Sequence, residues 1–191
     1  MKVVCVLGSP RSKGNSAALA KLFCKAAEKR GAAVQTFALN QLTYRGCQAC
    51  MACKTKLDRC VLEDDLTQVL EAVRKSDVLV MASPVFFGEV SSQLKGFIDR
   101  TFSYLLPDFA TNPNPSRLAL GKRLVFIQTQ AEPDERQFGD IFPRYDAFFR
   151  WYGFKDNHLI RCAGVSDKDE AEARMDVLDR VEEVARRVVV R

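Results

Sequence analysis

The sequence predicts an α/β protein in which a parallel sheet of five strands lies between two layers of helices. Short apolar runs of strand length alternate with stretches of helical periodicity along the whole chain of 191 residues. The first run, Val3 to Leu7, is apolar throughout, which is typical of parallel strands that are buried on both faces. The composition, 47% hydrophobic and 28% charged, is that of a globular protein, so we expect one domain over residues 1–191.

The first part of the chain alternates strand and helix. After the first strand, apolar residues recur at helical spacing over 14–30, and Gly31 is a natural stop for that helix. The next run, about 34–39, alternates in period, which indicates a less buried strand at an edge of the sheet. Beyond a cysteine-rich segment, Asp64 or Asp65 can cap the following helix.

The rest of the chain continues the same alternation. The expected elements are a strand over 77–82, a helix over 90–105, a strand over 123–130, a helix that begins at Asp134, a strand over 158–165 and a helix from Asp167. The helix after Asp134 carries an aromatic stripe of Phe138, Ile141, Phe142, Tyr145, Phe148, Phe149 and Tyr152. We interpret the stripe as core packing against the sheet, with a subunit interface as the alternative.

Five strand–helix units without an internal break imply right-handed crossovers and helices on both faces of the sheet. Such units most often wind in the flavodoxin-like order 2-1-3-4-5, and the edge-like second strand agrees with that order. We therefore expect a flavodoxin-like, doubly wound α/β/α fold. In such a sheet a ligand binds beyond the carboxyl ends of the strands, between the first and third strands.

Composition limits the classes of partner. The net charge is +5, but the basic residues are scattered, which argues against nucleic-acid binding and is compatible with an anionic ligand. No apolar run approaches the roughly 20 residues of a membrane helix. The chain begins with Met1, Lys2 and a strand, without the pattern of a signal peptide. We expect a cytoplasmic protein that binds neither membranes nor nucleic acid.

Two loops lie where the ligand is expected. The loop over 8–16, Gly-Ser-Pro-Arg-Ser-Lys-Gly-Asn-Ser, offers small residues, hydroxyl groups and Arg11 at the start of a helix, which suits a phosphate group. It matches neither the Walker loop nor the G-x-G-x-x-G dinucleotide fingerprint. The loop over 83–89 places Phe86 and Phe87 between Pro84 and Gly88, which suits a planar heteroaromatic ring.

These two motifs together resemble the NADPH-dependent FMN reductase family. Gly8-Ser9-Pro10-Arg11 with Gly14-Asn15-Ser16 is similar to its phosphate loop, and Ser83 to Gly88, followed by Gln93-Leu94-Lys95 and Asp99-Arg100, is similar to its isoalloxazine loop and the next helix. The similarity implies that Ser9, Arg11, Asn15 and Ser16 hold the FMN phosphate and that Pro84 to Gly88 frame the flavin ring. The loop over 129–134 departs from the glycine-rich pattern of many relatives.

The expected cofactor-binding residues are Ser9, Arg11, Lys13, Gly14, Asn15, Ser16, Pro84, Val85, Phe86, Phe87, Gly88 and Thr129. We expect no catalytic side chain, because the flavin itself carries the hydride chemistry. The single histidine, His158, falls at the start of the last strand, and there is no G-x-S-x-G elbow, so a histidine-based hydrolytic triad is improbable.

Four of the seven cysteines lie close together in sequence. Cys47, Cys50, Cys53 and Cys60 form C-x2-C-x2-C-x6-C, a spacing that resembles the cluster motif of the iron–sulfur flavoproteins and implies one [4Fe–4S] cluster. A zinc site, a redox-active thiol pair and cysteines without a ligand remain alternatives. Because the segment follows the second strand, we expect it near the flavin loops. The other cysteines, Cys5, Cys24 and Cys162, lie in apolar patterns and are expected in the core.

The leading functional hypothesis is an FMN-dependent oxidoreductase that takes hydride from NAD(P)H and passes electrons to a quinone, a flavin, a metal ion, oxygen or an iron–sulfur centre. A non-enzymatic electron carrier and a metal-binding regulatory module without flavin are the alternatives. Donor and acceptor are expected to be small molecules. Because flavin sites at a sheet edge are shallow and a second subunit can cover the ring, we expect a homodimer or homotetramer.

Overall fold

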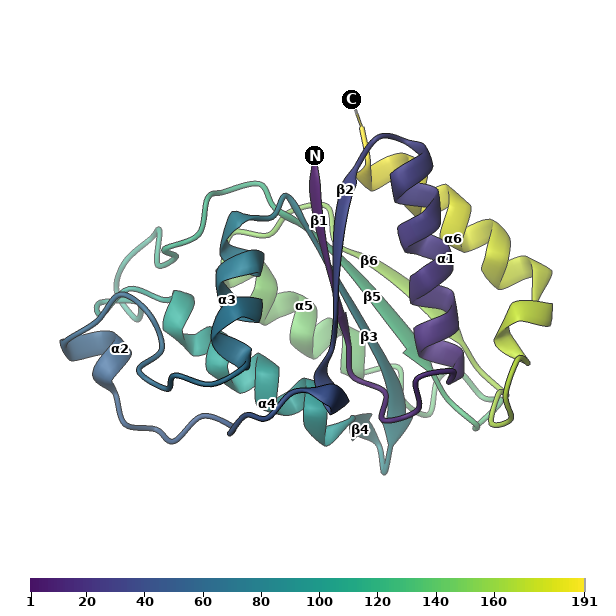
Figure 1. The fold of residues 1–191 in the computed structure, drawn as a ribbon, viewed down its shortest axis with the longest axis horizontal. Coiled ribbons are helices and arrows are strands. Elements are labelled where there is room, and N and C mark those ends of the chain that lie inside the picture. Colours follow the sequence, from purple (N-terminus) through teal and green to yellow (C-terminus); the bar gives the residue numbers. More distant parts are fainter. Residues whose placement is uncertain (191) are drawn as a thin grey trace.

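The computed structural model describes residues 1–190. The parallel strands of its central sheet are β1 (Lys2–Leu7), β2 (Ala33–Ala38), β3 (Val78–Phe86), β5 (Arg123–Thr129) and β6 (His158–Cys162). They lie in the order β2-β1-β3-β5-β6, which is the predicted winding, with β2 at an edge (Figure 1).

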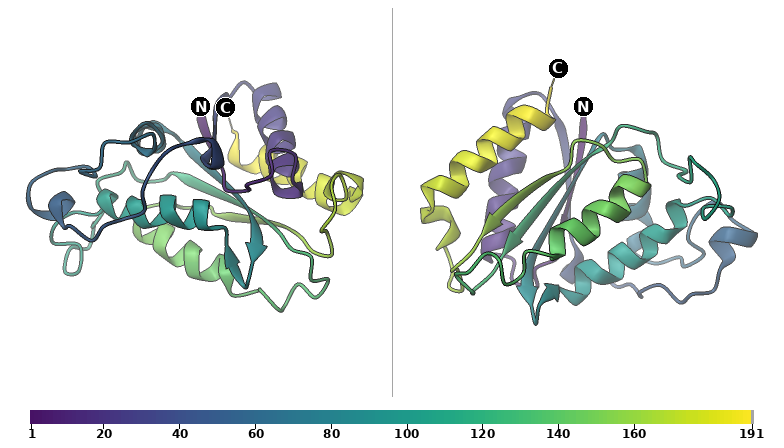
Figure 2. Two further views of the ribbon diagram at one scale, coloured as in Figure 1. Left: turned by 60° about the horizontal axis from the view of Figure 1, so that its bottom comes forward. Right: turned by 180° about the vertical axis from the view of Figure 1, so that it is seen from behind.

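Helices cover both faces of this sheet, as predicted (Figure 2). One face carries α1 (Asn15–Lys29) and α6 (Met175–Val188), and the other carries α3 (Leu66–Lys75), α4 (Ser92–Arg100) and α5 (Ile141–Trp151). A separate short helix, α2 (Ala52–Thr55), lies away from the sheet in the cysteine-rich segment. Among the helices of residues 1–190, none combines the length and the apolar character that a membrane crossing requires.

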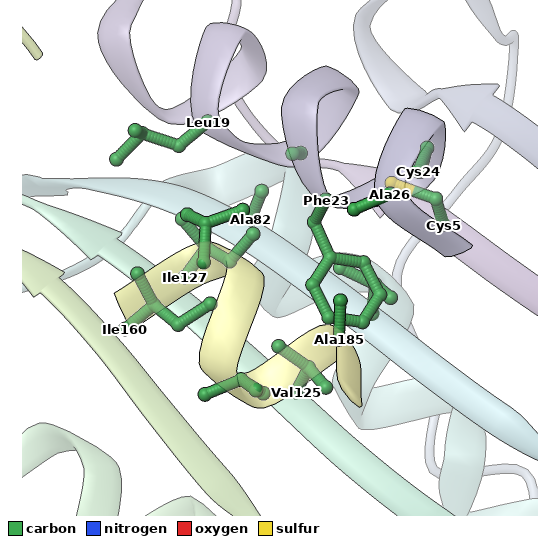
Figure 3. Close-up of a cluster of buried hydrophobic side chains, with 14 of the residues drawn as sticks. Cys5, Leu19, Phe23, Cys24, Ala26, Ala82, Val125, Ile127, Ile160 and Ala185 are labelled. Carbon is green, nitrogen blue, oxygen red and sulfur yellow. The ribbon is translucent and has the colours of Figure 1, made fainter. Parts of the chain in front are cut away.

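Alternation along the strands produces two cores. On β1, Val3 and Cys5 belong to the core under α1 and α6, whereas Val4 and Val6 belong to the core on the opposite face. Figure 3 shows the first core, where Phe23 of α1 and Ala185 of α6 pack together with side chains of the sheet. The three cysteines expected in the core are buried there: Cys5, Cys24 and Cys162.

The main unexpected element is a hairpin at the end of β3. This strand continues beyond the predicted residue 82 to Phe86 and pairs antiparallel with β4 (Glu89–Val90), a sixth strand that was not predicted. The turn consists of Phe87 (φ 51°) and Gly88 (φ 80°). Both residues have positive φ, as two-residue hairpin turns of type I′ require, but Phe is not a residue that signals such a turn.

Several helices begin or end differently from the prediction. The helix expected over 90–105 is divided into α4 and a 3₁₀ helix, Thr101–Tyr104. The helix expected at Asp134 begins only at Ile141, because the Asp134 carboxylate accepts the Arg136 N–H (3.0 Å) in a local turn. The last helix begins at Met175 rather than Asp167. Its expected start is occupied by a turn in which the Glu170 carboxylate accepts the N–H groups of residues 166 and 167.

The aromatic stripe of α5 packs mainly in the hydrophobic core, which was the preferred interpretation. Ile141, Tyr145, Phe149 and Tyr152 are buried, and Phe138 and Phe142 pack against the same core. Phe148 is the exception, with about half of its surface (53%) exposed.

Candidate functional site

A cavity opens at the carboxyl edge of the sheet, beyond the ends of β1, β3, β5 and β6. It has a volume of about 250 Å³. Its lining residues are Ser9, Arg11, Gly14, Asn15, Ser16, Pro84, Val85, Phe86, Thr129, Gln130, Ala131, Val165 and Ser166. The fold therefore brings nine of the twelve predicted cofactor-binding residues around one cavity. Lys13, Phe87 and Gly88 are the three that do not line it.

Close packing positions the loop after β1. A side chain at Gly8 would place its Cβ 2.7 Å from Leu94 Cβ and 2.9 Å from Ser91 Oγ, so only glycine fits there. The Ser91 hydroxyl donates to the Gly8 carbonyl (2.6 Å), which joins this loop to the start of α4. The loop is thus held against α4 before it turns into α1.

The start of α1 supplies unpartnered N–H groups to this cavity. The N-cap residue, Gly14, has no side chain that could cap the helix, and the first turn contains no acidic residue. Since the first N–H groups of a helix have no partner within it and carry the positive end of its dipole, they attract an anion. Ser16 is buried at this position, and the Arg11 side chain is exposed.

Two polar residues of the loop differ from their predicted roles. The Asn15 side chain is already engaged, because its Nδ2 donates to the Asp167 carbonyl (2.8 Å) and its Oδ1 accepts the Ala171 N–H (3.2 Å). It therefore joins α1 to the segment after β6. Lys13 points to a different cavity, which it lines together with other lysines. Although Lys13 belongs to the same loop, it does not line the candidate site.

The end of β3 forms the opposite wall. Pro84, Val85 and Phe86 line the cavity, whereas Phe87 lies at the tip of the hairpin with its ring fully exposed. The Glu89 carboxylate accepts the Tyr145 hydroxyl (2.9 Å), which anchors the hairpin to α5. Burial and the neighbouring Glu89 both raise the pKa of Tyr145 above its ordinary value.

The prediction missed four lining residues: Gln130, Ala131, Val165 and Ser166. They follow the ends of β5 and β6, and that position at the carboxyl edge was the available signal. Gln130 is buried, and its amide nitrogen donates to the carbonyls of Glu132 (3.0 Å) and Asp134 (3.1 Å). These hydrogen bonds therefore help to fix the conformation of the loop over 129–134, which departs from the glycine-rich pattern of many relatives.

His158 lies at the first residue of β6, at the strand end opposite to the cavity. It is buried, and its Nε2 lies 2.9 Å from Asp156 Oδ1. His158 does not line the candidate site.

A second cavity is formed by the cysteine-rich segment and the end of α4. All four predicted metal ligands, Cys47, Cys50, Cys53 and Cys60, line it, together with Arg100 and Phe102. Ala49 and Met51, between the cysteines, have positive φ values of 50° and 56°, so this stretch winds irregularly around the cavity.

Buried basic side chains surround the cysteine cavity. Lys54 is 8% exposed, and its Nζ lies 3.5 Å from Cys53 Sγ. Burial lowers the pKa of the Lys54 ammonium, and the neighbouring Cys53 opposes that shift. The fully buried Arg100 side chain pairs with Asp64 at 2.6 Å. Burial by itself would raise the pKa of Asp64, but the hydrogen bonds from Arg100 and the Arg45 N–H hold it below its ordinary value.

The cysteine cavity does not adjoin the first cavity, contrary to the expectation. After β2 the chain runs along α4, with the Tyr44 hydroxyl donating to the Gln93 carbonyl (2.6 Å) and Arg100 Nη1 donating to the Arg45 carbonyl (3.2 Å). The cysteines therefore lie at the far end of α4 from the hairpin (Figure 1). The sequence could not predict this position of the cysteines, because no feature of residues 40–46 indicates that the segment runs alongside a helix.

Comparisons with known proteins place the chain in a family. Residues 1–135 match the NADPH-dependent FMN reductase family, and this stretch includes both predicted flavin loops and all four clustered cysteines. The chain belongs to this family.

Relatives within the family include iron–sulfur flavoproteins. One from Archaeoglobus fulgidus is 36% identical over 104 residues, which are 54% of this chain and 47% of that protein. Another from Methanocaldococcus jannaschii is 34% identical over 101 residues, 53% of this chain and 52% of that protein. The matched stretch thus spans about half the length of these relatives.

Solved structures with the same fold include oxidoreductases. An NAD(P)H:quinone oxidoreductase from Methanothermobacter marburgensis superposes with a TM-score of 0.79 at 16% identity, covering 100% of this chain and 97% of that one. An FMN-dependent NADH-azoreductase from Bacillus anthracis, solved with FMN, has a TM-score of 0.74 at 15% identity and 99% coverage of both chains. At this identity the likeness concerns the fold.

The first cavity fits the cofactor of this family. An FMN phosphate needs N–H donors and a positive potential, which the uncapped start of α1, Ser9 and Arg11 supply. The ring needs an apolar wall, which Pro84, Val85 and Phe86 provide.

The four cysteines that line the second cavity are a donor set of the kind that holds an iron–sulfur cluster. Within residues 1–190, no three His, Cys, Asp or Glu side chains converge closely enough to hold one metal ion. In a [4Fe–4S] cluster each thiolate binds a different iron, so the four sulfur atoms lie farther apart than ligands of one ion. Arg100 Nε is buried at this cavity without a hydrogen-bond partner. Such an orphaned donor is suited to the sulfur atoms of a cluster.

Proposed function

We propose that the protein is an FMN-dependent oxidoreductase that takes hydride from NAD(P)H and passes electrons to a small-molecule acceptor. The observation that supports this most is the single cavity that joins the uncapped start of α1 to the end of β3, in a chain of the FMN reductase family. Electron acceptors that suit such a flavin are quinones, free flavins and iron–sulfur centres.

In this proposal the residues of the chain bind and orient, and the bound FMN supplies the hydride chemistry. The first-turn N–H groups of α1, with Ser9, Ser16 and Arg11, hold the phosphate. Pro84, Val85 and Phe86 support the ring, and Thr129 and Gln130 close the cavity from the end of β5. Asn15 acts indirectly, because it fixes α1 against the segment after β6.

The test is NAD(P)H oxidation by purified protein with a soluble quinone as the acceptor. The rate is expected to rise in proportion to bound FMN and to vanish in protein stripped of flavin. Stripped protein that oxidises NADPH as fast as the flavin-loaded protein contradicts the proposal. A flavin-loaded protein that oxidises neither nucleotide but exchanges electrons with reduced ferredoxin identifies the alternative, a non-enzymatic carrier.

For the cysteine cavity we propose a [4Fe–4S] cluster held by Cys47, Cys50, Cys53 and Cys60. The shared cavity and the unpartnered Arg100 Nε support it. Iron, acid-labile sulfide and zinc are measured in one anaerobic sample, before and after reconstitution with ferrous iron and sulfide. About four iron and four sulfide per chain are expected. One zinc per chain, or no metal after reconstitution, contradicts the cluster and leaves the flavin proposal untouched.

A further inference from the structure

Lys54 is held beside the cysteine cavity by three acceptors. Its Nζ donates to the Phe102 carbonyl (2.7 Å), to the Leu105 carbonyl (2.9 Å) and to Cys53 Sγ (3.5 Å). The same nitrogen lies 4.1 Å from the centre of the Phe102 ring. An ammonium group has three N–H donors, so each has one acceptor here, and the third is directed at a cysteine sulfur.

The surroundings of this cavity carry excess positive charge. Arg117 Nη1 donates to the Cys53 carbonyl (3.0 Å), so a second basic side chain contacts the same cysteine. Arg100 lies on another side, and Asp64 is the only acid in residues 1–190 that forms an ion pair with any of these three basic residues. Buried cations are costly unless an anion compensates them. The cavity is therefore suited to an anionic occupant.

We propose that Lys54 raises the reduction potential of the cluster through a charged hydrogen bond to the Cys53 thiolate. This inference rests on the cluster proposed above. A cluster held by four thiolates is an anion, and it becomes more negative when it takes up one electron. A fixed cation beside one ligand stabilises the reduced form more than the oxidised form. The step is a one-electron uptake in which no bond forms or breaks and no proton moves.

The structure offers a variant that removes this charge with little other damage. In Lys54→Met, the Phe102 carbonyl still accepts the Leu105 N–H (3.1 Å), and the Leu105 carbonyl still accepts Arg117 Nη1 (2.6 Å). Neither buried carbonyl is left without a partner. Lys54→Arg retains the charge. Lys56→Met is the matched control, because it removes the same charge from an exposed side chain of the same segment.

The experiment is a redox titration of the reconstituted, FMN-loaded protein with dithionite and mediators, with the EPR signal of the reduced cluster as the readout. Iron, sulfide and FMN contents are measured for every variant. At the midpoint potential of the wild type, Lys54→Met is expected to lower the ratio of reduced to oxidised cluster about tenfold, a shift of about 59 mV for a one-electron couple. Lys56→Met is expected to titrate like the wild type, and Lys54→Arg to recover most of the difference.

Each of the other outcomes either supports or overturns the proposed role of Lys54. A full cluster in Lys54→Met with the same potential as in Lys56→Met overturns the role of Lys54 and leaves the cluster proposal intact. If Lys54→Met loses iron but Lys54→Arg does not, the positive charge of residue 54 is needed to keep the cluster bound. That result supports the electrostatic role of Lys54. Loss from both variants overturns it, because charge is then not the property that matters. A wild type that binds no iron overturns this inference and the cluster together, while its FMN content still tests the flavin site separately.

Discussion

Arg11 and Lys13 lie in the same loop, but only Arg11 lines the candidate flavin cavity. We predict that Arg11→Ala weakens FMN binding about tenfold, since an exposed charged hydrogen bond contributes about 1.5 kcal/mol, the lower end of its usual range. Lys13→Ala removes an equal charge outside the cavity, where solvent screens it, and is expected to change the affinity by less than about threefold. Fluorescence titration of stripped protein with FMN measures both, and equal effects would show that only net charge matters.

At the scale of elements, the β3–β4 hairpin combines an unfavourable backbone position with a fully exposed ring. Phe87 has φ 51°, a region that side chains other than Asn and Asp rarely adopt. We predict that Phe87→Asn increases the free energy of unfolding by about 1 kcal/mol, because Asn-Gly is a preferred pair for this turn. Urea denaturation measures the change.

Phe148→Asn serves as the control for this prediction. Phe148 is also exposed, over about half of its surface (53%), but it lies within α5, where Asn is a poorer helix former than most residues. This variant is expected to gain no stability. If both variants are stabilised, the gain comes from removing exposed apolar surface, and the backbone argument for Phe87 is wrong.

At the scale of the whole molecule, the candidate flavin cavity is open beside the exposed rings of Phe86 and Phe87. An exposed aromatic pair next to a ligand cavity is typical of a surface that a partner covers. We predict a homodimer or homotetramer whose second subunit covers this edge. Light scattering coupled to size exclusion measures the mass, and the mass of a dimer or tetramer is expected. A wild-type monomer at working concentration would refute this.

Much of the fold follows from local sequence alone. The apolar run at Val3 to Leu7, the stop at Gly31 and the less buried edge strand β2 each depend on neighbouring residues, and all three appear in the structure as predicted. The strand order follows from them, because right-handed crossovers leave few ways to wind five strand–helix units. Most of the candidate flavin site could be predicted for the same reason, since a parallel sheet brings the ends of its strands to one edge.

Other features depend on contacts between residues that are distant in the chain, and only the tertiary structure decided them. Asn15 was expected to face a phosphate, but contacts with residues 167 and 171 occupy its amide. The cysteine segment was expected near the flavin loops, but contacts with α4 carry it to the far end of that helix. Nothing in the sequence distinguishes Lys54, whose ammonium donates to carbonyls about fifty positions away in the chain. Periodicity and capping act over a few residues, whereas these hydrogen-bond partners meet only when the whole chain is packed.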